Sequence, residues 1–240
     1  MKKIQFIVFV CSITCIFLTN VLFFKNHTQS TPIRTPLKRI QPVTWTNPYN
    51  LQTLAPFDHS SLVNITEFQF TINNKRCNVN NSSSDELFLV IFVHSAPRNF
   101  DKRQSIRSTW GNENNLINSH NEFRLVFLVG QVDNPSLQKK LDEENDLYHD
   151  LVQGNFIDSY RNLTYKHVMG LKWVVYYCQN AKYIFKTDDD IFVDIFQLNY
   201  YLKGNFGNNY PPKNLIICYV IKNPYPKRSQ RSKWRVTFKV

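Results

Sequence analysis

The stretch Leu87-Phe-Leu-Val-Ile-Phe-Val93 is an unbroken apolar run with polar residues on both sides. Such a run is typical of a strand that is buried on both faces, as the strands of a parallel sheet are. Phe123-Arg-Leu-Val-Phe-Leu-Val129, which Gly130 follows, predicts a second strand of the same kind. Tyr183-Ile-Phe185 predicts a third, shorter strand.

Helical patterns lie between these strands. Phe100 to Trp110 predicts a helix with Arg103 and Arg107 one turn apart on one face. Asn134-Pro135 supplies a good N-cap and first residue for a second helix. Leu163 to Cys178 predicts a third helix, because its apolar residues recur along one stripe. Strands that alternate with helices indicate an α/β layered domain with a mainly parallel sheet.

The N-terminus has the features of a membrane anchor. Residues 4–24 are 21 residues without a charge, which at about 1.5 Å rise per residue can span a hydrocarbon core of about 30 Å. Lys2 and Lys3 precede the run, which predicts a cytosolic tail at residues 1–3 and a single-pass type II signal anchor. The alternative is a cleaved signal peptide. The apolar run exceeds the usual length of about 7–15 residues, however, and no small-residue cleavage site follows it.

Residues 25–84 are expected to form a stem, because they are rich in Pro, Thr and Asn and show no helical or strand period. Residues 85–240 are then the expected folded domain. Sequons for N-glycosylation agree with a location outside the cytosol, and they begin at Asn64, Asn80, Asn81 and Asn162.

Three cysteines lie outside the predicted anchor, at Cys77, Cys178 and Cys218. In an oxidising compartment an odd number means that one of them is free, pairs with another chain or has lost a partner. Neither a Cys-x-x-Cys pair nor a Cys/His spacing suggests a zinc site.

The net charge of +11 and the sequence pI near 9.4 raise the possibility of nucleic-acid binding. The charge is unevenly placed, however. Residues 195–240 hold nine basic side chains and no acidic one, whereas residues 26–194 hold 17 basic and 18 acidic ones. Together with the anchor and the sequons, this distribution argues against a nucleic-acid partner. The chain has 6 glycines and no Gly-rich phosphate-loop motif.

The most informative polar stretch is Lys186-Thr-Asp-Asp-Asp190, which apolar residues flank on both sides. Adjacent carboxylates there repel one another and lose hydration, and a divalent cation would offset both costs. Carboxylates suit Mg²⁺ or Mn²⁺, and open α/β sheets bind ligands at the carboxyl ends of their strands. In an extended segment Asp188 and Asp190 would point the same way and Asp189 the opposite way. The alternative is a solvated acidic turn.

Several blocks follow one another in a defined order: Ser95-Ala-Pro97, Arg103-Gln-x-Ile-Arg-x-Thr-Trp-Gly111, Phe127-Leu-Val-Gly130, Asp158-Ser-Tyr-Arg-Asn-Leu-Thr164, Lys166, Lys172-Trp173, Lys186-Thr-Asp-Asp-Asp-Ile-Phe-Val193 and Lys233-Trp234. In these blocks the chain resembles the β-1,3-galactosyltransferase family, glycosyltransferase family 31, of Golgi type II membrane enzymes. The Arg103–Gly111 block and the triple-Asp block are together the most specific part of the resemblance.

The resemblance implies a GT-A fold, a Rossmann-like sandwich that binds a nucleotide sugar, behind an N-terminal transmembrane helix. It implies that galactose or N-acetylglucosamine is transferred from a UDP-sugar, with inversion and in β-1,3 linkage, to a glycoprotein or glycolipid in the Golgi lumen. Mn²⁺ (or Mg²⁺) held by Asp190 and Asp188 would bridge the diphosphate of the donor.

The residues that the resemblance implies in donor binding are Asp188, Asp189, Arg103, Arg107, Asp158 and Lys166. Structural alternatives stay open for four of them. Arg103 and Arg107 could be solvated helix charges, and Asp158 and Lys166 could be a structural cap and a surface lysine.

The resemblance also implies a later acidic block that supplies the general base for the acceptor hydroxyl. This chain has no Asp or Glu after Asp194, so the base is expected beyond Val240 and the catalytic domain at 85–240 is expected to be partial. The alternative function is that of a catalytically inactive, membrane-anchored relative that binds glycans or acts as a partner subunit.

Overall fold

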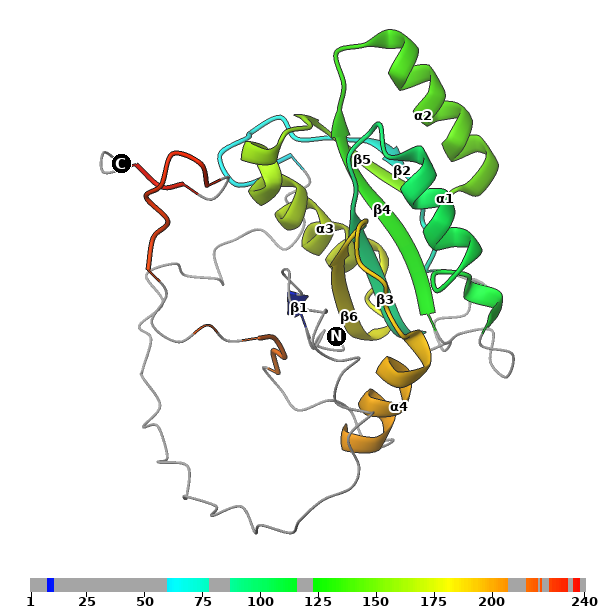
Figure 1. The fold of residues 1–240 in the computed structure, drawn as a ribbon. Helices are drawn as coiled ribbons and strands as arrows, with labels where there is room; N and C mark the ends of the chain where they lie inside the picture. The colour runs from blue at the N-terminus through cyan, green and yellow to red at the C-terminus, as the bar shows by residue number, and fades with distance from the viewer. Residues whose placement is uncertain are drawn as a thin grey trace.

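The computed structural model describes residues 8–10, 60–77, 87–115, 123–206, 215–219, 221, 225–232 and 235–237. These residues contain a six-stranded sheet in the order β1-β6-β3-β4-β5-β2 (Figure 1). The strands are β1 (Val8–Val10), β2 (Phe70–Asn73), β3 (Leu87–His94), β4 (Phe123–Gln131), β5 (Leu151–Ile157) and β6 (Ala181–Asp188). Only β2 runs antiparallel to its described neighbour, so the predicted α/β class with a mainly parallel sheet is confirmed.

Four α-helices cover both faces of the sheet: α1 (Phe100–Ser108), α2 (Pro135–Tyr148), α3 (Leu163–Tyr177) and α4 (Ile195–Phe206). Figure 1 shows α1 and α2 on one side of the sheet and α3 on the other. Short 3-10 helices, η2 (Glu113–Asn115) and η3 (Tyr160–Asn162), lie in the connections. The three helices predicted from sequence are therefore present, whereas α4, β2 and β5 were not predicted.

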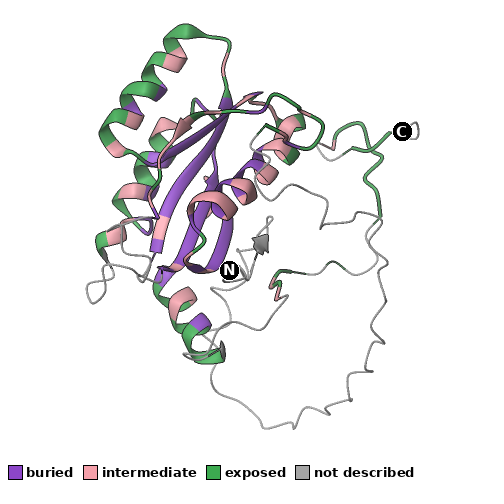
Figure 2. Cartoon of the chain, turned by 180° about the vertical axis from the view of Figure 1, so that it is seen from behind, coloured by how far each residue is buried: buried purple, intermediate pink, exposed green. Residues whose placement is uncertain are grey.

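The strand alternation divides the apolar interior into two layers. Leu89, Ile91 and Val93 of β3 pack with buried residues of α1, α2 and α4. Val90 and Phe92, which point to the opposite face, pack with buried residues of α3. Figure 2 shows the resulting concentration of buried residues along the strands. This double burial explains why β3 is a continuous apolar run and why β4 is apolar from Leu125 to Val129.

The structure of residues 8–10 differs from the membrane anchor predicted at residues 4–24. Val8–Val10 is a strand that pairs in parallel with β6, with Val8 opposite Ile184. The remaining residues of the predicted span at 4–24 lie outside the described residues. Within the part of the chain that the structure describes, no helix has the length and apolar character needed to cross a membrane. The transmembrane helix therefore stays a prediction.

Residues 60–77 belong to the folded domain, although they lie within the range expected to form a stem. Leu62 and Phe68 are buried in the layer beneath α3. Phe70–Asn73 forms β2 and pairs antiparallel with β5. The sequence did not predict this strand because it is short and lies at the edge of the sheet, where its pattern of burial is weak.

Gly170 of α3 packs tightly against the sheet, because an added Cβ would clash with Leu128 Cδ1 of β4. We expect Gly170→Ala to lower the free energy of unfolding by about 1–3 kcal/mol, since the fully buried Leu128 side chain would have to shift within a packed layer. Gly204→Ala is the matched control. Its Cβ would meet nothing within 4 Å, and the better helix propensity should add about 0.5–1 kcal/mol. Urea unfolding of the two variants measures the difference, and equal effects would contradict this account of Gly170.

Candidate functional site

Polar side chains gather where β3 and β6 end, at the carboxyl edge of the sheet. β3 ends at His94 and β6 at Asp188, and the two residues are partners in the parallel register. The next backbone amide, that of Asp189, donates to the carbonyl of His94 over 3.1 Å. The triple-Asp motif therefore lies beside the loop that begins at Ser95. Ligands of open α/β sheets bind at this edge.

The three carboxylates have different surroundings. Asp188 is 39% exposed, and its Oδ1 accepts a hydrogen bond of 2.6 Å from Lys186 Nζ. Asp189 is 8% exposed and bonds to residues of α1 and of the loop before it. Asp190 is exposed, and it has no hydrogen bond or ion pair with any described residue. Asp188 and Asp189 thus contact different parts of the protein.

The alternation does not extend to Asp190. β6 ends at Asp188, and residues 189–190 form a turn. The argument that Asp188 and Asp190 point the same way required an extended segment, so it does not apply to this backbone. The two side chains nevertheless remain the more exposed carboxylates of the motif.

His94 is a buried polar residue of the site that the sequence analysis missed. Burial lowers its pKa to about 2, with further contributions from the positive charges of Lys186 and Lys166 and from His167. The imidazole is therefore neutral at pH 7. Its Nδ1 lies 4.0 Å from Asp188 Oδ1, and its Nε2 has no hydrogen-bond partner among the described residues. Its position directly after the apolar run 87–93 was the available signal.

Lys166 and Asp158 join the ends of three strands. The Lys166 ammonium is buried, donates to the carbonyl of Ser95 over 2.7 Å, and lies 2.7 Å from Asp158 Oδ2. The same Asp158 oxygen accepts from the backbone amide of Gly130 over 2.6 Å. Burial lowers the pKa of Lys166, and the neighbouring Asp158 opposes that shift. Lys166 is therefore not a surface lysine, and Asp158 is bonded to the end of β4.

Arg103 is buried and Arg107 is half-buried, so neither is a solvated helix charge. Arg103 is fully buried, and its guanidinium binds both carboxylate oxygens of Glu144 on α2. It also donates to Ser95 Oγ and to backbone carbonyls of the Ser95 loop. Arg107 pairs with Glu144 and Asp150 at 2.7 Å each, which raises its pKa despite the opposing effect of burial. The alternative left open by the sequence, that the two are solvated helix charges, is therefore wrong.

The donor set at this edge fits a divalent cation. In the described part of the chain no three His, Cys, Asp or Glu side chains are grouped so that they could hold a metal ion. Mg²⁺ and Mn²⁺ sites often use one or two carboxylates together with water and substrate phosphates, however. Asp188 and Asp190 supply two such carboxylates at a partly exposed edge. They fit a site that is completed by a phosphorylated ligand.

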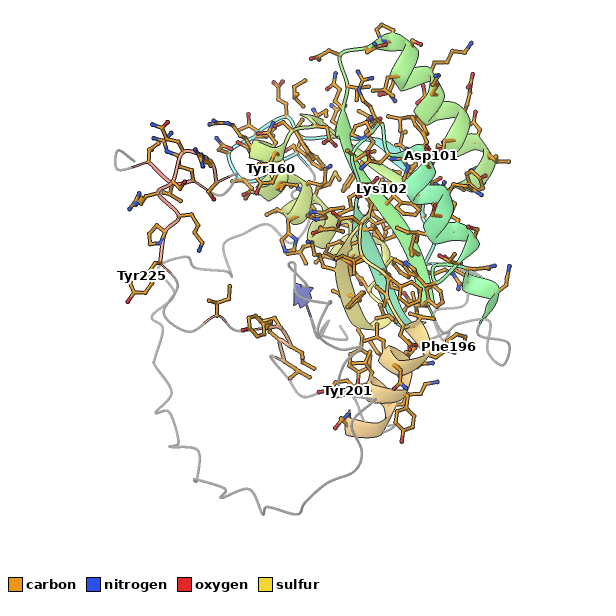
Figure 3. All side chains as sticks on the ribbon, viewed as in Figure 1. Asp101, Lys102, Tyr160, Phe196, Tyr201 and Tyr225 are labelled. Atoms are coloured by element: carbon orange, nitrogen blue, oxygen red, sulfur yellow. A yellow bond between two sulfur atoms is a disulfide. The ribbon has the colours of Figure 1, made fainter. Side chains whose placement is uncertain are left out.

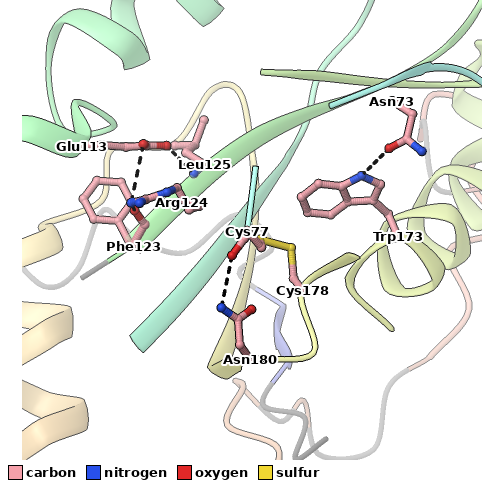
Figure 4. The surroundings of a disulfide bond; sticks show 9 residues. All are labelled: Asn73, Cys77, Glu113, Phe123, Arg124, Leu125, Trp173, Cys178 and Asn180. Carbon is pink, nitrogen blue, oxygen red and sulfur yellow. Dashed lines mark hydrogen bonds and ion pairs between the residues drawn. A yellow bond between two sulfur atoms is a disulfide. The ribbon is translucent and has the colours of Figure 1, made fainter. Parts of the chain in front are cut away.

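A disulfide between Cys77 and Cys178 joins residues separated by 101 positions (Figure 4). Asn180 Nδ2 donates to the carbonyl of Cys77 over 3.1 Å, and Trp173 Nε1 donates to Asn73 over 3.0 Å nearby. Cys218 is the exposed free cysteine of the described residues. The pairing identifies Cys218 as the odd cysteine, for which the three alternatives stay open.

The predicted glycosylation residues differ in their surroundings. Asn64 is exposed in a turn, and its Oδ1, not the nitrogen to which a glycan attaches, accepts from the Tyr165 hydroxyl over 2.6 Å. Asn162 uses that nitrogen to donate to the carbonyl of Ile157 over 2.8 Å. Asn80 and Asn81 lie outside the described residues. The exposed Asn64 is therefore the more accessible of the two described positions.

Comparisons with known proteins show what the chain is similar to. Residues 101–239 match the family model described as Galactosyltransferase. Human and mouse beta-1,3-galactosyltransferase 1 are 40% identical over 172 residues, which are 72% of this chain and 50% of the relative. Human lactosylceramide 1,3-N-acetyl-beta-D-glucosaminyltransferase is 34% identical over 178 residues, covering 72% of this chain and 45% of that protein. The chain spans about half the length of the curated relatives it matches.

Proposed function

Because this chain belongs to the galactosyltransferase family, we propose that it transfers galactose, or N-acetylglucosamine, from a UDP-sugar to an acceptor sugar in β-1,3 linkage and with inversion. The names of the relatives include both donor sugars, so both remain candidates. The proposed acceptor is a glycoprotein or glycolipid. The mainly parallel sheet with helices on both faces supports a fold of the GT-A type.

The observation that carries this proposal is the position of Asp188 and Asp190 at the carboxyl edge of the sheet. We propose that these two residues hold Mn²⁺ or Mg²⁺ against the diphosphate of the donor. A bound cation would neutralise the negative charge that develops on UDP as it leaves. The Lys186 ammonium donates a hydrogen bond to Asp188 Oδ1. This bond orients the Asp188 carboxylate and leaves Oδ2 for a ligand.

The other predicted donor residues support the site from within the protein. Arg103 and Lys166 hold the Ser95 loop through its hydroxyl and carbonyl oxygens. Asp158 fixes Lys166 and the end of β4, and Arg107 shares Glu144 with Arg103. We propose that these four residues shape the donor site by positioning its loops.

The proposed location is the Golgi membrane, with the folded domain in the lumen. An anchor at residues 4–24 would include Val8–Val10, so it requires that this strand give up its pairing with β6. The buried Cys77–Cys178 disulfide supports an oxidising compartment, where such bonds form and persist. The exposed Asn64 sequon agrees with that compartment. No nucleic-acid partner is proposed.

Asp190→Ala is expected to weaken Mn²⁺-dependent binding of UDP at least about tenfold, or about 1.4 kcal/mol, because an exposed metal carboxylate is lost. Calorimetric titration of the full chain with UDP, with and without Mn²⁺, measures this. Asp146→Ala removes the same charge from an exposed position on α2 and should leave the affinity unchanged. Equal affinities of the Asp190→Ala variant and the unmodified chain would refute the metal assignment. Binding of UDP-galactose without turnover would favour the inactive-relative alternative.

A further inference from the structure

We propose that Asp189 is a positioning residue that ties the triple-Asp motif to the start of α1, and that it is a ligand of neither the metal nor the donor. The inference rests on the proposed function for what is positioned, namely a donor site built on Asp188 and Asp190. It assigns a role to Ser95, Asn99 and Lys102 that the sequence did not suggest.

The contacts of the Asp189 carboxylate are made within the protein. Oδ2 accepts from Ser95 Oγ over 2.8 Å and from Asn99 Nδ2 over 2.7 Å. Oδ1 accepts from the ammonium of Lys102 over 3.2 Å. Lys102 lies in the first turn of α1 (Figure 3). With the side chain 8% exposed, little of the carboxylate remains for a hydrated cation. Hydrogen bonds to an ionised group are the strong ones, so this arrangement is costly to displace.

The donors themselves are held in place. Arg103 Nη1 donates to Ser95 Oγ over 3.0 Å, so the serine proton is left to point to Asp189. Lys166 holds the carbonyl of Ser95. The backbone amide of Asp189 also donates to the carbonyl of His94. Backbone and side chain of Asp189 therefore bind the same β3–α1 connection, which fixes the turn that carries Asp188 and Asp190.

Asn99 allows a specific test of the contact between Asp189 and the start of α1. It is the residue before α1, where a side chain commonly caps the helix, yet its side chain makes no capping hydrogen bond. Its contact with Asp189 is thus the bond that Asn99→Ala removes. The backbone carbonyl of Asn99, which accepts from the amide of Arg103, is unaffected by that substitution.

The experiment compares Asn99→Ala, Asp189→Asn, the double variant and Asp190→Asn in the full chain, using Mn²⁺ and UDP as probes. We expect the first three to weaken Mn²⁺ affinity in the presence of UDP by factors of about 3–10, with Asn99→Ala the mildest because Ser95 and Lys102 still bind Asp189. Asp190→Asn should weaken it more. The electron paramagnetic resonance spectrum of bound Mn²⁺ should be unchanged by Asp189→Asn and altered by Asp190→Asn.

The proposal is overturned if Asn99→Ala leaves Mn²⁺ affinity unchanged, or if Asp189→Asn alters the Mn²⁺ spectrum as Asp190→Asn does. Failure of the proposed function has a different signature, since the unmodified chain would then bind neither Mn²⁺ nor UDP. In that event thermal unfolding tests the contact between Asn99 and Asp189. The double variant should have the same unfolding midpoint temperature as the less stable single variant. Additive losses of stability from the substitutions at positions 99 and 189 would overturn the proposal.

Discussion

Glu144→Ala is expected to lower the free energy of unfolding by about 3–5 kcal/mol, because it leaves buried arginine charge without its partner. Glu144 Oε2 lies 2.6 Å from the fully buried Arg103, and Oε1 lies 2.7 Å from Arg107. Arg107 keeps Asp150, whereas the remaining described partners of Arg103 are uncharged oxygens of Ser95, Ala96 and Pro97. Most of the loss therefore arises at Arg103.

Urea unfolding of the full chain measures the loss, and Glu143→Ala is the matched control. Glu143 is the preceding residue of α2, is 63% exposed and pairs with the exposed Lys139 at 3.8 Å. Exposed pairs of this kind contribute little, so its removal should change stability by less than about 0.5 kcal/mol. A loss for Glu144→Ala no larger than that of the control would show that the buried pair is not needed for stability.

Cys178→Ala is expected to lower the free energy of unfolding by about 2–5 kcal/mol. The disulfide closes a loop between residues separated by 101 positions, and long loops restrict the unfolded chain most. It also attaches the C-terminal end of the 60–77 segment to the end of α3. The loss should therefore be accompanied by faster proteolytic cleavage within residues 60–77.

Two controls make the disulfide prediction specific. Treatment with a reducing agent should destabilise the unmodified chain and have no further effect on Cys178→Ala. Cys218→Ser should leave the unfolding midpoint unchanged, since that thiol is exposed and unpaired in the described structure. A reductant-sensitive Cys178→Ala variant would mean that other cysteines form the stabilising bond.

Local sequence was sufficient to predict the elements whose buried apolar residues follow one regular pattern. β3 was predicted from an unbroken apolar run and β4 from a run that only Arg124 interrupts, since a strand covered on both faces has no polar side. The start of α2 followed from Asn134-Pro135, and Asn134 Oδ1 indeed accepts from the amide of Leu137. β2 was missed because its four residues pair with β5, which lies about 80 positions later in the chain, a contact that a local pattern does not contain.

The sequence by itself determined the α/β class, the position of the triple-Asp motif at the end of a strand and, through its ordered blocks, the family. Only the tertiary structure decided what each charged residue contacts. Asp189 meets Ser95 from 94 positions away, and Arg103 meets Glu144 from 41 positions away. Burial and partners control whether a charge is available to a ligand, and both arise only when distant segments pack together.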